Sequence, residues 1–455
     1  MSSDLITQAL STATETKAIA FGNDVLGETG PMFTELFPDA RVLVVADENT
    51  FAAAGEPVVA SLRASGVEFA EDPYIFPGTP TLYAGYDNVI KLREHMAPLE
   101  NTVVCSIGSG TLNDIAKLAS GELKRPYMNV CTAASVDGYA SFGASIAKDG
   151  FKITRSCPAP AGLVADIAVM VDAPKRLTAT GYGDLIEKVP AGADWILADA
   201  LGVEAIDEYT WNLVQGPLRK SLADPAAIGA GDPDAIEGLA EGSIMSGLAM
   251  QSLQSSRPAS GAGHQFSHTW EMEGHGLDWE PPLSHGFKVG IGTIASCALW
   301  EFFLSKSADD FDVERALASV RTPEEVEAEV RATLKPQMQD EAVKHSLTKR
   351  MEGDALRERI ALLKEVWPSL RERCQEQIMT PQEVMDRLKT VGAPYHPELI
   401  DIDWDRFRET HLKARMIRDR YTVLDILTDL GMFDEAVEYL FSPEGFWGQH
   451  RHPEA

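Results

Sequence analysis

Histidines gather in one short stretch of this chain, and their spacing suggests a metal site. Four of the ten histidines lie between residues 264 and 285: His264, His268, His275 and His285. His264 and His268 are four residues apart, so both imidazoles lie on one face if this segment is helical. His285 precedes an apolar helical run, so a second helix can offer a second ligand. Neutral imidazole is the commonest metal ligand in proteins, whereas His275, in a loop between two glycines, is expected to be exposed.

A carboxylate can complete this set of ligands. The sequence Gly-Asp-Leu-Ile-Glu-Lys at residues 183–188 opens a helical region and places Asp184 just inside a helix. One carboxylate and two imidazoles with open positions suit a Lewis-acid metal site of the catalytic kind. We therefore predict that Asp184, His264 and His285 bind a metal ion. Glu187 is a rival ligand, and Asp184 could instead serve the helix dipole.

A glycine-rich turn after a buried strand offers a place for an anion. The sequence Ile-Gly-Ser-Gly-Thr-Leu-Asn-Asp at residues 107–114 joins this strand to a helix. Glycines let the backbone approach a ligand, and free N–H groups at a helix start favour a phosphate. The alternative is a tight turn without a ligand, because Asn113 stands where the usual dinucleotide fingerprint has its third glycine. Asp47 favours a nucleotide, because an acid that ends a strand can bind ribose hydroxyls; its alternative role is that of an acid at a helix N-terminus.

The elements that must position these residues form two regions. In the first third of the chain, short β-branched runs alternate with helical stretches, which implies βαβ units and a mostly parallel sheet. From about residue 178 the strand signals fade, and apolar residues recur at three- and four-residue steps. We expect a Rossmann-like α/β domain over residues 1–177, followed by an all-α domain over residues 178–455.

Local signals give expectations for single residues and segments. Residues 66–69 are expected to begin a strand, and Lys117, in the helix after the glycine turn, is expected to face solvent. Thr322 and Thr380, each followed by proline and then by an acid, predict two capping boxes. Pro368 is expected to end the helix in which it lies.

Composition limits the classes of function that fit. Lys and Arg total 40 among the 455 residues, and Asp and Glu total 69, so the net charge is −29. Such a surface repels phosphate backbones and anionic lipids, so we expect neither a nucleic-acid nor a membrane partner. Five widely spaced cysteines are typical of reduced thiols in a cytoplasmic protein. The start of the chain lacks the features of a signal peptide, and no uncharged apolar stretch reaches the ~18 residues that span a bilayer.

Several stretches, taken in order along the chain, together resemble one known family. They lie at residues 108–114, 131–141, 183–188, 256–261, 264–268, 285–286 and 417–425. The set resembles the bacterial sn-glycerol-1-phosphate dehydrogenases of arabinose operons. That family belongs to the dehydroquinate-synthase-like and iron-containing alcohol dehydrogenase superfamily. The resemblance covers roughly residues 15–445, and it implies the dehydroquinate-synthase-like fold.

The resemblance also assigns roles around the metal. It implies that Asp184, His264 and His285 are the ligands and that His268 lies at a proton-relay position. The metal varies among nickel, zinc and iron within the family, so its identity does not carry over. Homo-oligomers are common in the family, and we expect one here.

For the cofactor, the resemblance implies NAD, with NADP also possible. The residues that match the phosphate-binding turn are Gly108, Ser109, Gly110, Thr111 and Asp114. Those that match the loop past the nicotinamide and the substrate are Thr132, Ser135, Asp137 and Ser141. Asp137 is the expected partner of a substrate hydroxyl, and Asp47 favours NAD over NADP.

The expected reaction is hydride transfer between NADH and C2 of dihydroxyacetone phosphate, which gives sn-glycerol 1-phosphate. Lys152, Lys188 and Arg257 are candidate partners of the substrate phosphate. Lys188 follows Asp184 by four residues, so the two could instead form an ion pair on one helix face, and Arg257 could instead cap a loop.

Two departures from the family pattern leave the substrate open. Gly263 stands where members often have Glu, and Cys131-Thr132-Ala133-Ala134-Ser135 replaces a threonine-rich opening. The alternatives are a dehydrogenase of glycerol or another unphosphorylated polyol, and a dehydroquinate-synthase-like lyase. The lyase would use several more basic residues than the sequence shows. A non-catalytic protein that binds metal and nucleotide is the remaining alternative.

Overall fold

The computed structural model describes residues 4–453, which form two compact units. The first unit comprises the chain up to Leu185 together with Tyr209–Ser256 and Gly274–Gly286. The second comprises Ile186–Glu208, Arg257–Glu273 and the chain from Phe287 onward. The domain boundary expected after residue 177 stays a prediction.

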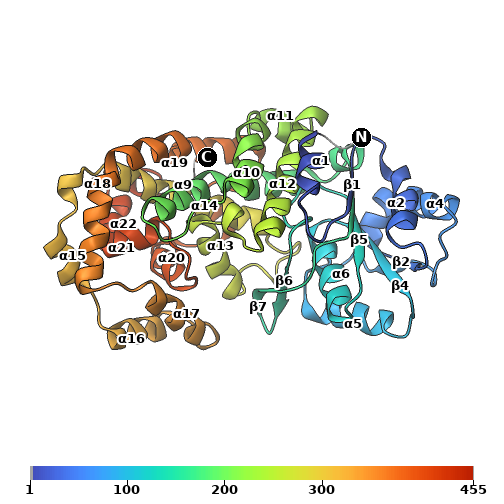
Figure 1. Cartoon of the computed structure of the whole chain (residues 1–455), viewed down its shortest axis with the longest axis horizontal. Helices are drawn as coiled ribbons and strands as arrows, with labels where there is room; N and C mark the ends of the chain where they lie inside the picture. The colour runs from blue at the N-terminus through green and yellow to red at the C-terminus, as the bar shows by residue number, and fades with distance from the viewer. Residues whose placement is uncertain (1–3, 454–455) are drawn as a thin grey trace. The chain divides into compact units, whose positions relative to one another are not determined.

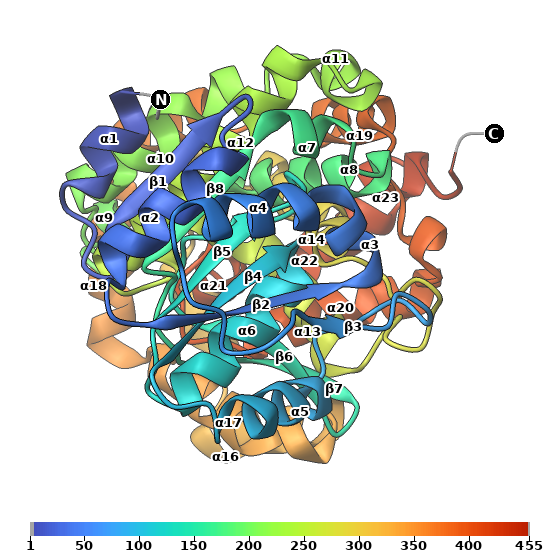
Figure 2. The same ribbon diagram turned by 90° about the vertical axis from the view of Figure 1, so that its right-hand side faces the viewer.

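A parallel sheet forms the centre of the first unit. Among the described residues it has six strands in the order β1-β8-β5-β4-β2-β3 (Figure 2). Every neighbouring pair is parallel, so the expected parallel α/β sheet is confirmed. The strands are β1 (Ala18–Gly22), β2 (Arg41–Asp47), β3 (Tyr74–Phe76), β4 (Thr102–Gly108), β5 (Tyr127–Cys131) and β8 (Gly162–Asp166).

Helices cover both faces of this sheet (Figure 1). Along β2, Val42 and Val44 pack in one core cluster with α2 (Thr29–Leu36) and α4 (Glu56–Ala64). Leu43 and Val45 point the other way, because side chains alternate along a strand. They pack with α5 (Tyr86–Met96) and α6 (Gly110–Glu122). Burial on both faces explains why these strands are continuous apolar runs.

The strand order reverses between β2 and β4. The chain goes from β2 to β3 on one side of this point, and from β4 to β5 on the other. In open parallel sheets, ligands bind beyond the carboxyl ends of the strands at such a reversal. Asp47 ends β2 and Gly108 ends β4, so the predicted ribose acid and the glycine turn flank it.

Some elements of the first unit differ from the expectation. Residues 66–69 form no strand; Phe69 makes an isolated bridge to Val42, and β3 begins only at Tyr74. The antiparallel hairpin of β6 (Ala144–Lys148) and β7 (Phe151–Arg155) was not predicted. The remaining helices of this unit are α1 (Asp4–Leu10), α3 (Glu48–Thr50), α7 (Ile167–Val171), α8 (Lys175–Leu185), α10 (Glu208–Ser221), α11 (Pro225–Ala230) and α12 (Pro233–Leu253).

The described part of the second unit is helical, as expected. Its elements include α9 (Lys188–Ala200), α13 (Ala262–Met272), most of α14 (His285–Leu304), α15 (Val313–Ser319), α16 (Pro323–Thr333), α17 (Pro336–Lys349), α18 (Gly353–Gln377), α19 (Pro381–Val391), α20 (Trp404–Met416), α21 (Val423–Asp429), α22 (Phe433–Phe441) and α23 (Phe446–Gln449). By length and composition α14 could cross a membrane, but 89% of its apolar window is buried inside the protein. The apolar helical run expected after His285 is therefore a buried helix.

Helix ends in the second unit follow the sequence signals only in part. Thr322 and Glu325 form the predicted capping box of α16, whereas Thr380 caps α19 through the N–H of Glu383 alone. The expected helix end at Pro368 is wrong, because α18 continues to Gln377. Its buried stripe runs on past the proline, and this packing outweighs the roughly 3 kcal/mol that an interior proline costs.

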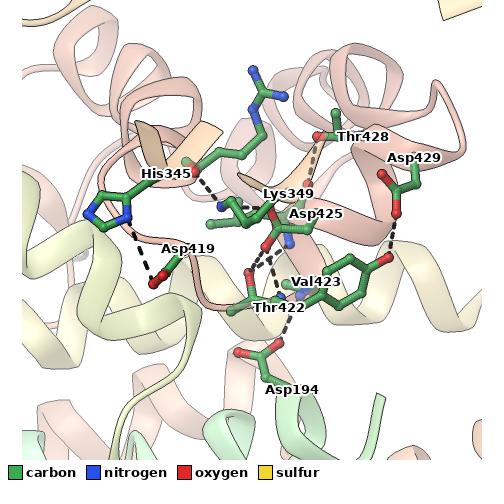
Figure 3. A network of polar contacts seen from close by, with 12 residues as sticks. Asp194, His345, Lys349, Asp419, Thr422, Val423, Asp425, Thr428 and Asp429 are labelled. Atoms are coloured by element: carbon green, nitrogen blue, oxygen red, sulfur yellow. Dashed lines mark hydrogen bonds and ion pairs between the residues drawn. The ribbon is translucent and has the colours of Figure 1, made fainter. Parts of the chain in front are cut away.

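A buried polar network joins several helices of this unit (Figure 3). Asp425 forms the capping box of α21 with Thr422, and its other oxygen lies 2.7 Å from Lys349 Nζ. The N–H of Val423 donates to Asp194 Oδ1 of α9 at 2.9 Å. A buried carboxylate that accepts from helix-terminal amides fixes where those helices begin.

Candidate functional site

Three of the predicted residues form a ligand group. Asp184 lies near the end of α8, His264 in the first turn of α13, and His285 at the start of α14. Each offers one ligand atom, and these atoms all lie within 4.8 Å of one another. Among the described residues this group does not include Glu187 or His275. One carboxylate and two imidazoles fit a divalent transition metal.

Close backbone packing brings Asp184 and His285 together. A Cβ at Gly286 would lie 1.9 Å from the carbonyl oxygen of Thr180, so only glycine lets α14 start against α8. A Cβ at Gly181 would likewise lie 1.9 Å from the carbonyl oxygen of Ala134. The first turn of α14, α8 and the loop after β5 therefore lie in direct backbone contact.

Asp137, the predicted partner of a substrate hydroxyl, lies beside Asp184. Its backbone N–H donates to Asp184 Oδ2 at 3.1 Å, and its own Oδ2 accepts from Ser246 Oγ of α12 at 3.0 Å. Both carboxylates are buried, and these bonds fix their orientation. Sequence reasoning missed Ser246, because a single serine in an apolar helix carries no signal of its own.

The glycine turn leaves a helix start that suits an anion. Ser109 is the N-cap of α6, but its side chain does not cap the helix. A Cβ at Gly110 would lie 2.8 Å from Val136 Cγ1, so this glycine also allows the loop after β5 to pack closely. Thr111 is half-buried in the first turn. The uncapped N–H groups of this turn are free to bind a phosphate.

The other side of α6 holds the loop that follows β5. Lys117 Nζ donates to the carbonyl oxygens of Gly138, Ser141 and Gly143 at 2.9, 2.8 and 3.1 Å. Its side chain is fully buried, so the expected solvent exposure is wrong. Asp114 Oδ2 accepts from the N–H of Ser145. Burial raises the pKa of Asp114 and lowers that of Lys117, and each charge opposes the shift of the other.

The other loop residues matched to the nicotinamide region, Thr132, Ser135 and Ser141, are buried, and their bonds go to the loop itself or to the end of β4. Thr132 N–H donates to the carbonyl oxygen of Gly108 at 3.3 Å. Ser135 Oγ lies 3.2 Å from the hydroxyl of Tyr139, and Ser141 Oγ donates to the Gly138 carbonyl at 3.1 Å. The loop is thus held in one shape at the carboxyl edge of the sheet.

Asp47 caps a helix in this structure. Its Oδ1 accepts from the N–H groups of Asn49 and Thr50, both at 2.9 Å, and these bonds begin α3. This is the alternative role that the sequence left open. The ribose contact stays a prediction, and so do the nucleotide contacts of the glycine turn.

The candidate phosphate partners have different surroundings. Lys188 begins α9, and a turn at residues 186–187 separates it from α8, so the single helix face expected for Asp184 and Lys188 is wrong. Arg257 is fully buried and donates to the carbonyl oxygens of Asp194 and Tyr421. Lys152 lies on β7, and its charge acts on Asp114. Their contacts with a substrate stay predictions.

The two histidines of α13 each meet a carboxylate. His264 Nδ1 lies 2.7 Å from Glu187 Oε2. His268 Nδ1 lies 3.2 Å from Glu271 Oε2, and its ring centroid is 5.8 Å from that of His264. Burial lowers the pKa of His268 to about 3, so its imidazole is neutral. His275 is half-buried and packs edge-on against Trp279.

The sequence of this chain is similar to that of one protein family and to several named enzymes. The profile of iron-containing alcohol dehydrogenases matches residues 20–174. The glycerol-1-phosphate dehydrogenase (NAD(P)+) of Halalkalibacterium halodurans is 35% identical over 274 residues, which are 60% of this chain and 68% of that protein. The protein of the same name from Pyrococcus furiosus is 34% identical over 278 residues, 61% of this chain and 77% of that one. That of Bacillus licheniformis is 26% identical over 420 residues, 91% and 89% of the two chains.

Solved structures share the fold. Glycerol dehydrogenase from Schizosaccharomyces pombe superposes with a TM-score of 0.56 at 16% identity, and covers 97% of this chain and 93% of that one. A probable glycerol dehydrogenase from Sinorhizobium meliloti gives 0.57 at 15% identity, with 93% and 98% covered. At these identities the likeness concerns the fold alone, and the expected fold class is confirmed.

Proposed function

Because the chain belongs to the glycerol-1-phosphate dehydrogenase family of iron-containing alcohol dehydrogenases, we propose that it is a metal- and NAD(P)-dependent oxidoreductase. Its substrate pair is dihydroxyacetone phosphate and sn-glycerol 1-phosphate. The observation that carries the proposal is the ligand group of Asp184, His264 and His285, whose ligand atoms lie within 4.8 Å of one another. The names of relatives at 34–35% identity support the cofactor and the polyol phosphate.

Asp184, His264 and His285 hold the divalent metal in this proposal, and nickel, zinc and iron are the candidates. When bound, such a metal polarises the reacting oxygen of the substrate. His268, whose imidazole is neutral, lies at the proton-relay position, where it passes the proton of the substrate hydroxyl on to water without holding a charge itself. Asp137, oriented by Ser246, receives a hydrogen bond from a second hydroxyl.

The nucleotide lies at the reversal of strand order between β2 and β4 in this proposal. Its pyrophosphate binds the uncapped start of α6, at Gly108, Ser109, Gly110 and Thr111, while Asp114 supports this turn by accepting from the N–H of Ser145. Asp47 has one carboxylate oxygen in the α3 cap and offers the other to a ribose hydroxyl. A negative charge there disfavours a 2′-phosphate, so NAD is the preferred cofactor. The loop of Thr132, Ser135 and Ser141 contacts the nicotinamide.

The remaining parts of the proposal concern phosphate, assembly and compartment. Lys152, Lys188 and Arg257 supply positive charge for the substrate phosphate. We propose a homo-oligomer in the cytoplasm. All five cysteines are buried and none forms a disulfide, as in proteins of reducing compartments.

The test is NADH oxidation with dihydroxyacetone phosphate, using metal-stripped protein reloaded with nickel, zinc or iron in separate samples. We expect turnover that requires a metal, and we expect His264→Ala to lose both metal and turnover. Retained metal with full turnover in that variant would overturn the ligand assignment. Turnover of glycerol with NAD, but not of the phosphorylated substrate, would identify a polyol dehydrogenase instead.

A further inference from the structure

Glu187 makes two contacts at the start of α13. It lies in the turn between α8 and α9, and its side chain is fully buried. Its Oε2 lies 2.7 Å from His264 Nδ1, and its Oε1 accepts from the N–H of Gly261 at 3.0 Å. Gly261 is the N-cap residue of α13 and does not cap the helix with a side chain. One carboxylate therefore binds both the helix start and the imidazole that follows one turn later.

These two contacts determine which nitrogen of His264 carries the proton. An ionised carboxylate has acceptors only, so Nδ1 of His264 is the donor. In a neutral imidazole the other nitrogen, Nε2, then keeps its lone pair. Metal-binding histidines commonly donate their second N–H to a carboxylate, which fixes the ring orientation and makes the ligand nitrogen more basic.

Gly263 provides the space that Glu187 needs. A Cβ at residue 263 would lie 2.8 Å from Glu187 Cγ and 3.1 Å from the backbone nitrogen of Thr293. The glycine therefore allows the carboxylate to reach α13 while α13 packs on α14. This gives a physical reason for a position at which the sequence departs from the family it resembles.

We propose that Glu187 is a positioning residue, which fixes the tautomer and orientation of His264 so that Nε2 faces the metal. The inference rests on the proposed function, because it concerns a histidine that the proposed function assigns to the metal. Glu187 itself acts through His264 and does not bind the ion.

Glu187→Gln is the informative substitution, because it changes one acceptor into a donor. The amide offers one oxygen and one NH2 group, so it cannot accept from both Gly261 and His264. If its oxygen stays with Gly261, its NH2 faces His264 and favours the tautomer with the proton on Nε2. That tautomer lacks the lone pair on the metal-facing nitrogen. If the amide turns round, the Gly261 N–H is left without an acceptor.

The experiment compares cobalt(II) binding by metal-stripped parent and Glu187→Gln, followed by visible absorption and by elemental analysis. We expect the variant to bind about 10- to 100-fold more weakly. The control is Glu71→Gln, which removes a carboxylate from His95, a half-buried pair in the first unit; the affinity of this variant for cobalt(II) should equal that of the parent. Equal affinity of parent and Glu187→Gln would overturn the proposal.

A second readout needs neither metal nor a variant of Glu187. In metal-free parent labelled with ¹⁵N-histidine, the imidazole of His264 should carry its proton on Nδ1, and His264→Asn identifies the signal. A proton on Nε2 would overturn the proposal even if Glu187→Gln failed to fold. A parent that shows the Nδ1 tautomer but binds no divalent metal would overturn the proposed function, and with it the role of Glu187 in metal binding, while its hydrogen bond to His264 would stand.

Discussion

Lys117→Met removes a buried ammonium group and keeps most of the side-chain volume. In the folded protein Lys117 Nζ donates to three carbonyl oxygens between residues 138 and 143. Methionine fills the same buried space with an unbranched apolar side chain, but it donates no hydrogen bond to these carbonyl oxygens. The substitution therefore tests whether this one cation holds the loop that carries Asp137.

The loss of stability expected for Lys117→Met is the balance of two opposing free-energy terms. A buried carbonyl that loses its partner costs about 1–3 kcal/mol, and three carbonyls and Asp114 all lose their cation. Removing the ammonium also removes its desolvation cost, which is substantial because burial lowers the pKa of Lys117 despite the nearby Asp114. Breaking a buried charge pair by removal of one partner typically costs about 3–5 kcal/mol. We expect a loss of that size in the free energy of unfolding.

The assay is urea unfolding of the two proteins, followed by fluorescence and circular dichroism. Lys91→Met is the matched control, because Lys91 is exposed on α5 and lies 3.9 Å from Asp87. We expect this control to change stability by less than about 0.5 kcal/mol. An equally small change for Lys117→Met would refute the reasoning, because it would mean that the loop keeps its shape without the cation.

Two further predictions concern single positions. Burial raises the pKa of Asp429 to about 7, so its contribution to stability is full below about pH 4 and is lost as the pH rises through 7. Asp429→Asn should remove this fall in the free energy of unfolding, which is up to about 4 kcal/mol in total, as measured by urea unfolding across the pH range. An unchanged pH dependence in the variant would contradict the assignment. Gly286→Ala places a Cβ 1.9 Å from the Thr180 carbonyl, so it should displace His285 and weaken metal binding in a cobalt titration; parent-like affinity would show that the contact is not needed.

Elements bounded by strong local signals could be predicted from the sequence. The buried strand before the glycine turn and the helix after it are present as predicted, because an apolar run and then two glycines mark the change from one to the other. The prediction of a strand from residue 66 is wrong, because this segment pairs with β2 through only the single bridge between Phe69 and Val42. The helix through Pro368 could not be predicted, since its continuation depends on packing that local propensity does not describe.

The candidate ligands could be named from sequence because their chemistry is rare and clustered. A cluster of histidines, one of them before an apolar helical run, and one acid at a helix opening predicted Asp184, His264 and His285. The residues that hold the neighbouring loop and orient Asp137 could not be named in the same way. Lys117 and Ser246 are ordinary residues of helical segments, and only their long-range contacts give them a role.

The glycines of the site explain why the candidate ligands can be held by helices rather than by loops. A Cβ at Gly292 would lie 2.2 Å from the carbonyl oxygen of Gly263, and a Cβ at Gly286 would lie 1.9 Å from that of Thr180. At such contacts the distance between helices is set by backbone atoms, which do not change rotamer. His285, one residue before Gly286, and His264, one residue after Gly263, therefore start from fixed backbone positions. The carboxylate of Glu187 and the backbone N–H of Asp137 contact side chains whose backbones are already placed, which is the arrangement that a preorganised metal site requires.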